Sequence, residues 1–383
     1  MKISSLTVFC ILFFSLQGFA NDAMPWQNPH VSSINREPMT VHFLPYKTES
    51  GAMARYIMPD VERLSCDPST ERRLQLDGTW LFKYAKNNAS APENFFKKDF
   101  DARSWQQIQV PGSWELQVFD CPIYTDVRYP FPANPPFVPS DYNPVGSYIH
   151  TFNVPKEWQG MDIFIDFEGV ESAFYIWING KMVGYSEDSR LPAHFNVTPY
   201  LLSGENKLAV KVFRYSDGSY LEDQDYWKYS GIERSVYLQA RPHFRLHDFN
   251  LRASLVNDYR DGKFSLDVLL KGAVPHNKVE IKVLDDKNTT ILRREYKIRK
   301  SSDSTLNVAH VFPSVKQWSA ECPNLYKLVI NTMDTHGVLT ESVVHEFGFR
   351  SVEMRNGLLL VNGMPIKLNG LNRHEHDART GRT

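Results

Sequence analysis

The sequence has no excess of charge of either sign and few cysteines, and each of these lacks excludes a class of protein. Its 43 lysines and arginines against 44 aspartates and glutamates leave a formal net charge of −1, so we expect neither nucleic acid nor an anionic membrane as a partner. The chain has 4 cysteines and no Cys-x-x-Cys spacing, which excludes a disulfide framework and a structural zinc site. Beyond Cys10, we expect Cys66, Cys121 and Cys322 to be buried single thiols.

Two motifs for common chemistries are also missing. No Gly-x-Ser-x-Gly sequence is present to expose a nucleophilic serine on a strained turn, and no glycine-rich loop is present to hold a phosphate. The sequence therefore gives no support for a serine hydrolase or a nucleotide-binding protein.

Long apolar runs are confined to the N-terminus. Lys2, the apolar stretch from Leu6 to Leu16 and the small residues before Asn21 predict a secretory signal over residues 1–20. The apolar stretch is shorter than a membrane span. We expect cleavage before Asn21 and export to the periplasm or the exterior of a bacterial cell, with no membrane as a partner.

The remaining sequence is rich in aromatic and turn-forming residues. Aromatic residues make up 13% of the chain, with 20 glycines and 23 prolines, a composition typical of β-rich proteins. From about Leu74, short alternating runs are separated by turns, and one of them, Ala173–Ile178, leads into Asn179-Gly180. Asn-Gly is the strongest two-residue signal for a β-hairpin.

We predict an all-β protein with five segments. They are the signal at 1–20, an N-terminal arm at 21–59, a β-sandwich at 60–241, an immunoglobulin-like β-sandwich at 242–350, and residues 351–383, which resemble the start of a (β/α)₈ barrel. In the last segment two further Asn-Gly turns predict consecutive hairpins, and a strand then delivers His374, Glu375 and His376 at its end.

One run, Ser216–Arg234, concentrates the side chains that a sugar site needs. Its nineteen residues hold five carboxylates, three tyrosines and one tryptophan. Carboxylates accept hydrogen bonds from hydroxyls, and aromatic rings stack on the apolar face of a pyranose. The alternative is an ordinary acidic loop whose aromatic rings turn into the core.

Neither carboxylates nor histidines in these segments form a complete catalytic set. Glu222, Asp223 and Asp225 are too close in sequence to flank a glycosidic bond from both sides, so we expect them to accept hydroxyls or bind an ion. His374 and His376 are two residues apart and, with Asp377, could ligate a metal. A histidine that binds a substrate hydroxyl is the better interpretation, because no third ligand is well placed.

Several motifs together resemble the bacterial lactose-type β-galactosidases of glycoside hydrolase family 2. The resemblance covers about residue 30 to residue 383. It is carried by Asp77–Trp80, Val110–Trp114, Pro122–Asp126, Asn134–Val138, Gly184–Arg190, Ser216–Arg234, Trp318–Tyr326, Phe347–Arg350, Asn356–Gly363 and Asn372–His376. It implies a jelly-roll sugar-binding domain, an immunoglobulin-like sandwich and the first strand of a catalytic (β/α)₈ barrel.

The resemblance also implies roles for three residues. Asp225 would bind the galactosyl 6-hydroxyl and a sodium ion, and His374 would hydrogen-bond the galactosyl ring. Asp126 stands where the lactose-type pattern commonly has an asparagine that contacts the sugar, and a carboxylate there accepts hydrogen bonds but does not donate them.

The acid/base and nucleophilic glutamates of the family, and its magnesium ligands, map to no residue of this chain. The resemblance implies that they lie beyond Thr383, deep in the barrel. The expected function is therefore that of a retaining β-galactosidase acting on galactosides such as lactose, with these 383 residues inactive by themselves. The full-length enzyme could form a homo-oligomer. The alternatives are a related family 2 enzyme for another β-glycoside and a non-catalytic galactose-binding module.

Overall fold

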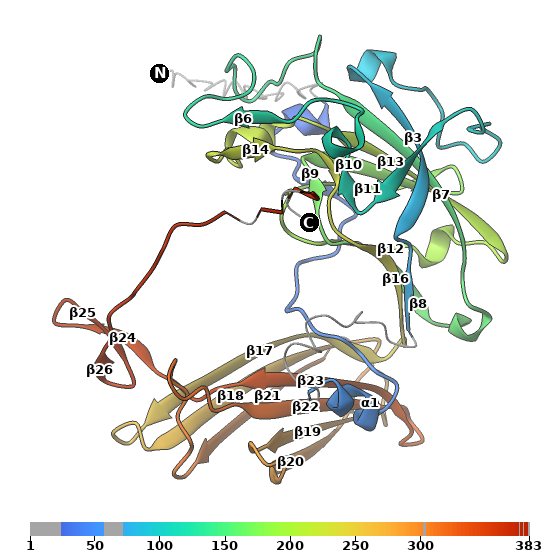
Figure 1. Cartoon of the computed structure of the whole chain (residues 1–383). Coiled ribbons are helices and arrows are strands. Elements are labelled where there is room, and N and C mark those ends of the chain that lie inside the picture. Colours follow the sequence, from blue (N-terminus) through green and yellow to red (C-terminus); the bar gives the residue numbers. More distant parts are fainter. Residues whose placement is uncertain (1–23, 57–71, 302–303, 375, 378, 382–383) are drawn as a thin grey trace, which may run out of the picture.

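The computed structural model describes residues 24–56, 72–301, 304–374, 376–377 and 379–381, which form an arm, two β-sandwiches and a C-terminal pair of hairpins (Figure 1). The predicted signal at 1–20 lies outside the described residues, and so do Cys10, Cys66 and Glu375. Thr383 lies outside them as well, so the expectation that the catalytic glutamates follow Thr383 stays a prediction. Among the described residues, no helix is both long enough and apolar enough to span a membrane.

The first sandwich packs a seven-stranded sheet against a four-stranded sheet. In spatial order the first sheet holds β1 (Ser33–Ile34), β11 (Lys181–Glu187), β10 (Ala173–Ile178), β13 (Glu205–Phe213), β7 (Val145–Asn153), β3 (Gly78–Ala85) and β4 (Gln106–Val110). The second holds β12 (Ala193–Asn196), β8 (Asp162–Phe167), β16 (Val236–Arg241) and β2 (Arg73–Gln75). Alternating residues of both sheets, such as Phe82, Val210, Ile165 and Leu238, form one buried core.

The hairpin predicted at Asn179-Gly180 joins β10 to β11. Both turn residues have positive φ, 52° and 84°, as a two-residue turn of the primed type requires. Short 3₁₀ turns and small strands complete this domain. They are η2 (Asn88–Ser90), η3 (Glu115–Gln117), η4 (Lys156–Trp158), η5 (Thr198–Tyr200), η6 (Asp217–Tyr220), β5 (Gly112–Ser113), β9 (Val170–Glu171), β15 (Gly231–Ile232), β6 (Ile123–Thr125) and β14 (Tyr226–Lys228).

The second sandwich has three strands facing four. They are β17 (Arg245–Val256), β18 (Asp261–Lys271) and β21 (Ser304–Phe312), and β20 (Thr290–Lys297), β19 (Lys278–Leu284), β22 (Tyr326–Met333) and β23 (Leu339–Phe347). Its core is separate and is built from side chains such as Phe264, Leu266 and Ile281. Seven antiparallel strands in two sheets form the expected immunoglobulin-like architecture.

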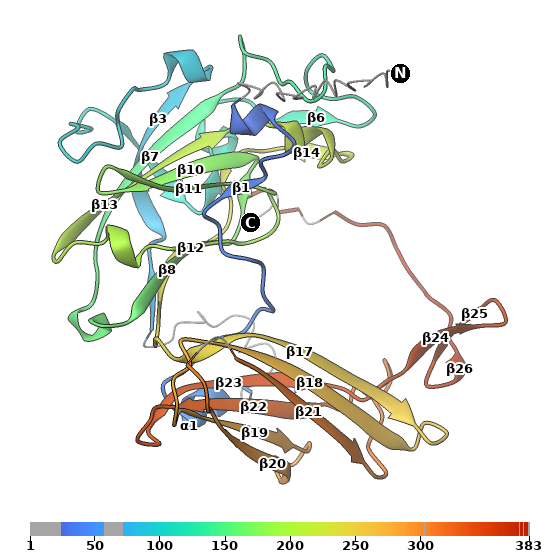
Figure 2. The ribbon, with the colours of Figure 1, turned by 180° about the vertical axis from the view of Figure 1, so that it is seen from behind.

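The arm connects the two sandwiches. It starts with η1 (Pro25–Gln27), where Trp26 stacks on Phe213 of the first sandwich at 4.2 Å, and it ends with α1 (Glu49–Ala54) on the second (Figure 2). No periodic pattern in the sequence predicted α1, but the Thr48 side chain caps it by accepting a hydrogen bond from the Gly51 amide at 3.1 Å. The two sandwiches are also joined by a buried ion pair, in which Arg241 at the end of β16 donates two hydrogen bonds of 2.8 Å to Glu341 of β23.

Two expectations from the sequence are corrected. Cys121 and Cys322 are exposed free thiols and not buried ones, because each lies in an irregular connection outside the cores. The C-terminal hairpins form as predicted, as β24 (Val352–Arg355), β25 (Leu358–Val361) and β26 (Met364–Pro365). The second correction concerns the strand that was predicted to lead to His374 and His376. No such strand follows β26 within the described residues, because no neighbouring strand in that part supplies hydrogen-bonding partners.

Candidate functional site

The run from Ser216 to Arg234 contributes one strand of a small two-stranded ribbon at the edge of the first sandwich. In this β6–β14 ribbon, Tyr226 lies opposite Thr125 and Trp227 lies opposite Tyr124. The Tyr124 hydroxyl donates a short hydrogen bond to Asp225 Oδ1, and the Tyr124 and Trp227 rings meet edge-on at 5.5 Å. Tyr124 is 53% exposed and Trp227 is 36% exposed, so this face presents two aromatic rings and a carboxylate to the solvent.

Asp126 lies at the same end of the ribbon. If the register of the two strands is continued by one residue, Asp126 stands opposite Asp225, and both side chains are exposed. The hydrogen bond to Asp225 raises the pKa of Tyr124, and the charge of Asp126 adds to that increase. The carboxylates of Asp225 and Asp126 therefore both favour the protonated form of the Tyr124 hydroxyl at this end of the ribbon.

His374 reaches the other face of the ribbon. Its ring lies 4.9 Å from the ring of Tyr226, a side chain that is only 5% exposed. His376 Nδ1 lies 3.1 Å from the Tyr226 hydroxyl. The C-terminal segment thus returns to the first sandwich (Figure 1), and all three predicted site residues lie at this one ribbon.

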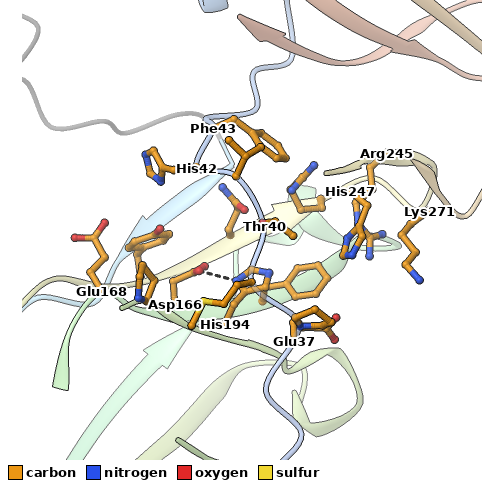
Figure 3. Close-up of a pocket in the computed structure, with 18 of the residues that line it drawn as sticks. Glu37, Thr40, His42, Phe43, Asp166, Glu168, His194, Arg245, His247 and Lys271 are labelled. Atoms are coloured by element: carbon orange, nitrogen blue, oxygen red, sulfur yellow. Dashed lines mark hydrogen bonds and ion pairs between the residues drawn. The ribbon is translucent and has the colours of Figure 1, made fainter. Parts of the chain in front are cut away.

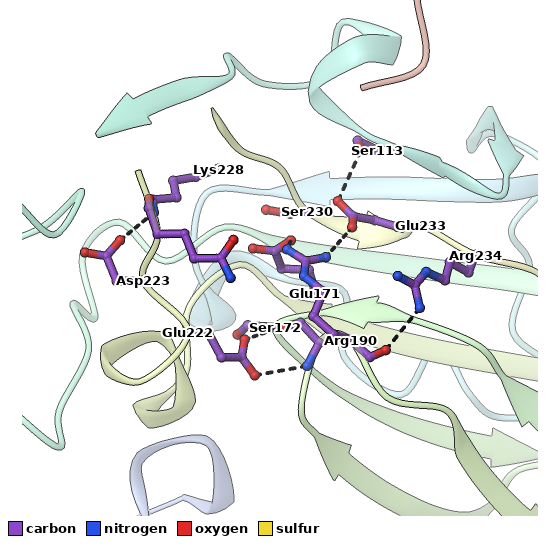
Figure 4. A network of polar contacts seen from close by, with 12 residues as sticks. Ser113, Glu171, Ser172, Arg190, Glu222, Asp223, Lys228, Ser230, Glu233 and Arg234 are labelled. Carbon is purple, nitrogen blue, oxygen red and sulfur yellow. Dashed lines mark hydrogen bonds and ion pairs between the residues drawn. The ribbon is translucent and has the colours of Figure 1, made fainter. Parts of the chain in front are cut away.

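The other carboxylates of the run are bound to protein groups beneath the ribbon (Figure 4). Glu222 accepts the Ser189 amide at 3.0 Å and also the Ser189 hydroxyl. Asp223 pairs with Lys228 at 2.5 Å, and Asp217 is buried, with only 7% of its surface exposed. Among the five carboxylates of the run, Asp225 is therefore the one that is placed to meet a ligand.

Arg190 joins two of the loops under the ribbon. One of its nitrogens is 2.6 Å from Glu171 and the other is 2.7 Å from Glu233. Burial and then the charge of Glu171 raise the pKa of Glu233 to about 7, against the attraction of Arg190. One guanidinium thus holds two carboxyl groups whose charge it only partly balances.

A buried arginine, Arg214, supports the segment that follows the ribbon. Arg214 lies 2.5 Å from Asp120 and 3.6 Å from Glu115, and Glu115 accepts the Ser230 amide at 3.0 Å. Burial dominates over the Arg214 charge and raises the pKa of Glu115 to about 8. The sequence did not single out these groups or Tyr124. The one available signal for Tyr124 was its place in the Pro122–Asp126 motif.

Three cavities near these elements differ in size, and one of about 630 Å³, lined by Phe131, Tyr142 and Tyr215, is larger than the other two. A space of about 30 Å³ beneath the ribbon is bordered by Glu171, Glu222 and Lys228, which is too small for a sugar. A cavity of about 350 Å³ lies between the arm and the two sandwiches (Figure 3).

Two of the rings that line the 350 Å³ cavity, Phe164 and His194, are occupied by contacts with protein groups. His194 stacks on Phe164 at 4.5 Å and its Nδ1 is 2.6 Å from Asp166, while Arg245 lies 5.1 Å from the Phe164 ring. We interpret this cavity as part of the joint between the domains.

No cluster of three or more histidine, cysteine or acidic side chains that could hold a metal occurs in the part of the chain that the structure describes. His374 and His376 therefore form no metal site with Asp377 there. At the ribbon, carboxylate and hydroxyl oxygens are available as ligands, and such hard donors suit a cation like sodium better than a transition metal.

Three family models match consecutive parts of the chain. The sugar binding domain of the glycosyl hydrolases family 2 matches residues 74–242, a second family 2 domain matches residues 244–350, and the family 2 TIM barrel domain matches residues 352–383.

Similar curated proteins are β-galactosidases. The chain is 40% identical to the one from Priestia megaterium over 374 residues, which cover 95% of this chain and 35% of that protein. It is 38% identical to the one from Vibrio cholerae over 366 residues, which cover 93% of this chain and 34% of that protein. The chain thus spans about a third of the length of these relatives.

Similar solved structures share the fold. A β-glucuronidase from Bacteroides uniformis aligns with a TM-score of 0.68 at 20% identity, over 81% of this chain and 36% of that one. A β-glucuronidase from Bifidobacterium dentium aligns with a TM-score of 0.64 at 20% identity, over 82% and 54%.

Proposed function

The chain belongs to glycosyl hydrolase family 2, and from this premise we propose that it supplies the galactose-recognising part of a retaining β-galactosidase. The observation that carries the proposal is the exposed face of the β6–β14 ribbon. There Tyr124 and Trp227 offer ring faces beside the Asp225 carboxylate. The β-galactosidases at 38–40% identity support galactose as the sugar.

The geometry of the described carboxylates supports recognition without cleavage. A retaining glycosidase needs two carboxyl groups about 5 Å apart on opposite sides of the bond. Glu222, Asp223 and Glu233 are each engaged by a protein donor or cation, and Asp225 accepts from Tyr124. None of them forms such a pair across an open site in the described part of the chain. We propose that the catalytic pair belongs to barrel sequence that would follow Thr383 in the full-length enzyme.

A sodium ion is part of the proposal. Asp225 would supply a carboxylate oxygen to it beside the Tyr124 hydroxyl, a set of hard oxygen donors that fits such an ion. When bound, the ion would offset the negative charge at this end of the ribbon. Magnesium is proposed only for the full-length enzyme.

Export is the remaining element of the proposal. It is supported by the charged residue, the apolar stretch and the small residues within positions 1–20. We propose a periplasmic or extracellular site of action.

The test is to titrate the purified chain with galactose by calorimetry in sodium chloride. Asp225→Asn should weaken binding about ten-fold, the order expected for loss of one charged hydrogen bond. Asp258→Asn is the matched control, because Asp258 is an exposed aspartate in a turn of the second sandwich. Equal binding by wild type and Asp225→Asn would contradict the proposal. We also expect no hydrolysis of a nitrophenyl galactoside by this chain alone.

A further inference from the structure

The open end of the ribbon carries two exposed carboxylates, Asp126 and Asp225, and the sodium ion proposed above would offset only one of their charges. The paired residues of β6 and β14 end at Thr125 and Tyr226, so Asp126 and Asp225 are the next residue along each chain segment, and the charges of both raise the pKa of Tyr124. Like charges directly opposite each other on neighbouring strands are destabilising. The two carboxylates therefore do not stabilise the short ribbon. Their negative charge acts instead on a ligand that approaches this end.

The basic residue of the ribbon does not balance the pair. Lys228 is the one lysine or arginine in β6 and β14, and its ammonium group is 2.5 Å from both Asp223 Oδ1 and the Gln224 carbonyl. The Tyr124 hydroxyl has a single proton, which it donates to Asp225. Asp126 is left exposed as an acceptor.

We propose that Asp126 is a specificity-determining residue that, together with Asp225, restricts this site to sugars without an anionic group. The inference rests on the proposed function, since it takes the exposed face of the ribbon as the sugar site. A neutral galactosyl residue donates hydroxyl protons to both carboxylates. A uronic acid or a sulfated galactose carries a negative charge that the two carboxylates repel, and it has fewer hydroxyl protons to donate to them. Repulsion by an unpaired charge in a site is one way in which a protein excludes a competing ligand.

The experiment compares three sugars on the same chain. Galactose, galacturonate and galactose 6-sulfate are titrated by calorimetry at neutral pH and low ionic strength, into wild type and Asp126→Asn. Wild type should bind galactose more tightly than either anion. Asp126→Asn should reduce that preference about five-fold, the factor expected for removal of one charge roughly 4 Å from another in water.

Two further measurements separate charge from shape. Asp126→Glu keeps the charge and should keep most of the preference, whereas Asp258→Asn should leave it unchanged. The preference of wild type should also fall as sodium chloride is added.

An unchanged preference in Asp126→Asn, or equal binding of galactose and galacturonate by wild type, would overturn this inference while leaving galactose binding and the proposed function intact. If galactose binds nowhere on the chain, the proposed function fails and this inference fails with it.

Discussion

Replacing Glu115 by glutamine should stabilise the first sandwich at neutral pH. The Glu115 side chain is fully buried, its Oε1 has no hydrogen-bond partner, and Arg214 is 3.6 Å away. Burial raises its pKa to about 8, so the folded protein holds a proton on Glu115 at pH 7 that the unfolded chain has lost. Glutamine resembles the protonated acid and still accepts the Ser230 amide.

The magnitude follows from the linkage between protonation and folding. Between the ordinary pKa of 4.5 and the folded pKa of about 8, the native state binds one more proton than the unfolded state. The free energy of unfolding of the wild type therefore falls by about 1.4 kcal/mol per pH unit as pH rises through this window. The glutamine variant lacks this titration and should be more stable than the wild type by about 3 kcal/mol at pH 7.

The assay is urea unfolding of both proteins between pH 4.5 and 8, followed by tryptophan fluorescence. Of the 8 tryptophans, all but Trp318 lie in the arm or the first sandwich, so the signal reports mainly on that domain. The two curves of stability should meet near pH 4.5 and separate as pH rises. Surface Glu321→Gln is the control. A glutamine variant less stable than wild type at pH 7 would show that Glu115 is ionised and bound to Arg214, and would refute the reasoning.

Two other predictions concern the joint and the C-terminal segment. Arg241→Met leaves Glu341 buried without its two hydrogen bonds, and should lower the free energy of unfolding in urea by about 3–5 kcal/mol. Arg103→Met, which breaks an exposed ion pair, is the control and should leave stability unchanged. Equal urea midpoints for the two variants would count against a buried pair. Tyr226→Phe removes the 3.1 Å contact to His376 but keeps the ring beside His374. The side-chain nitrogen resonances of His376 should then shift in NMR spectra, and unshifted resonances would mean that this segment does not contact the ribbon.

Local patterns predicted the elements but not the contacts beneath the site. Period-two alternation identified β10, and Asn179-Gly180 identified the hairpin that joins it to β11, because strand faces and primed turns depend on adjacent residues. The acidic run looked uniform in sequence, yet its carboxylates differ in role. Glu233 depends on Arg190, 43 residues away, and no local pattern encodes a pair at that separation. Burial of the run is likewise a tertiary property.

The central claim is that the exposed face of the β6–β14 ribbon binds galactose, and NMR of the tryptophan indole groups tests it most directly. On titration with galactose, the account predicts that the Trp227 indole signal and the amides of residues 124–126 shift together, and that Asp225→Asn needs about ten times more sugar to reach the same shifts. An unmoved Trp227, with shifts gathered instead at His42 and His194 in the cavity between the domains, would contradict it.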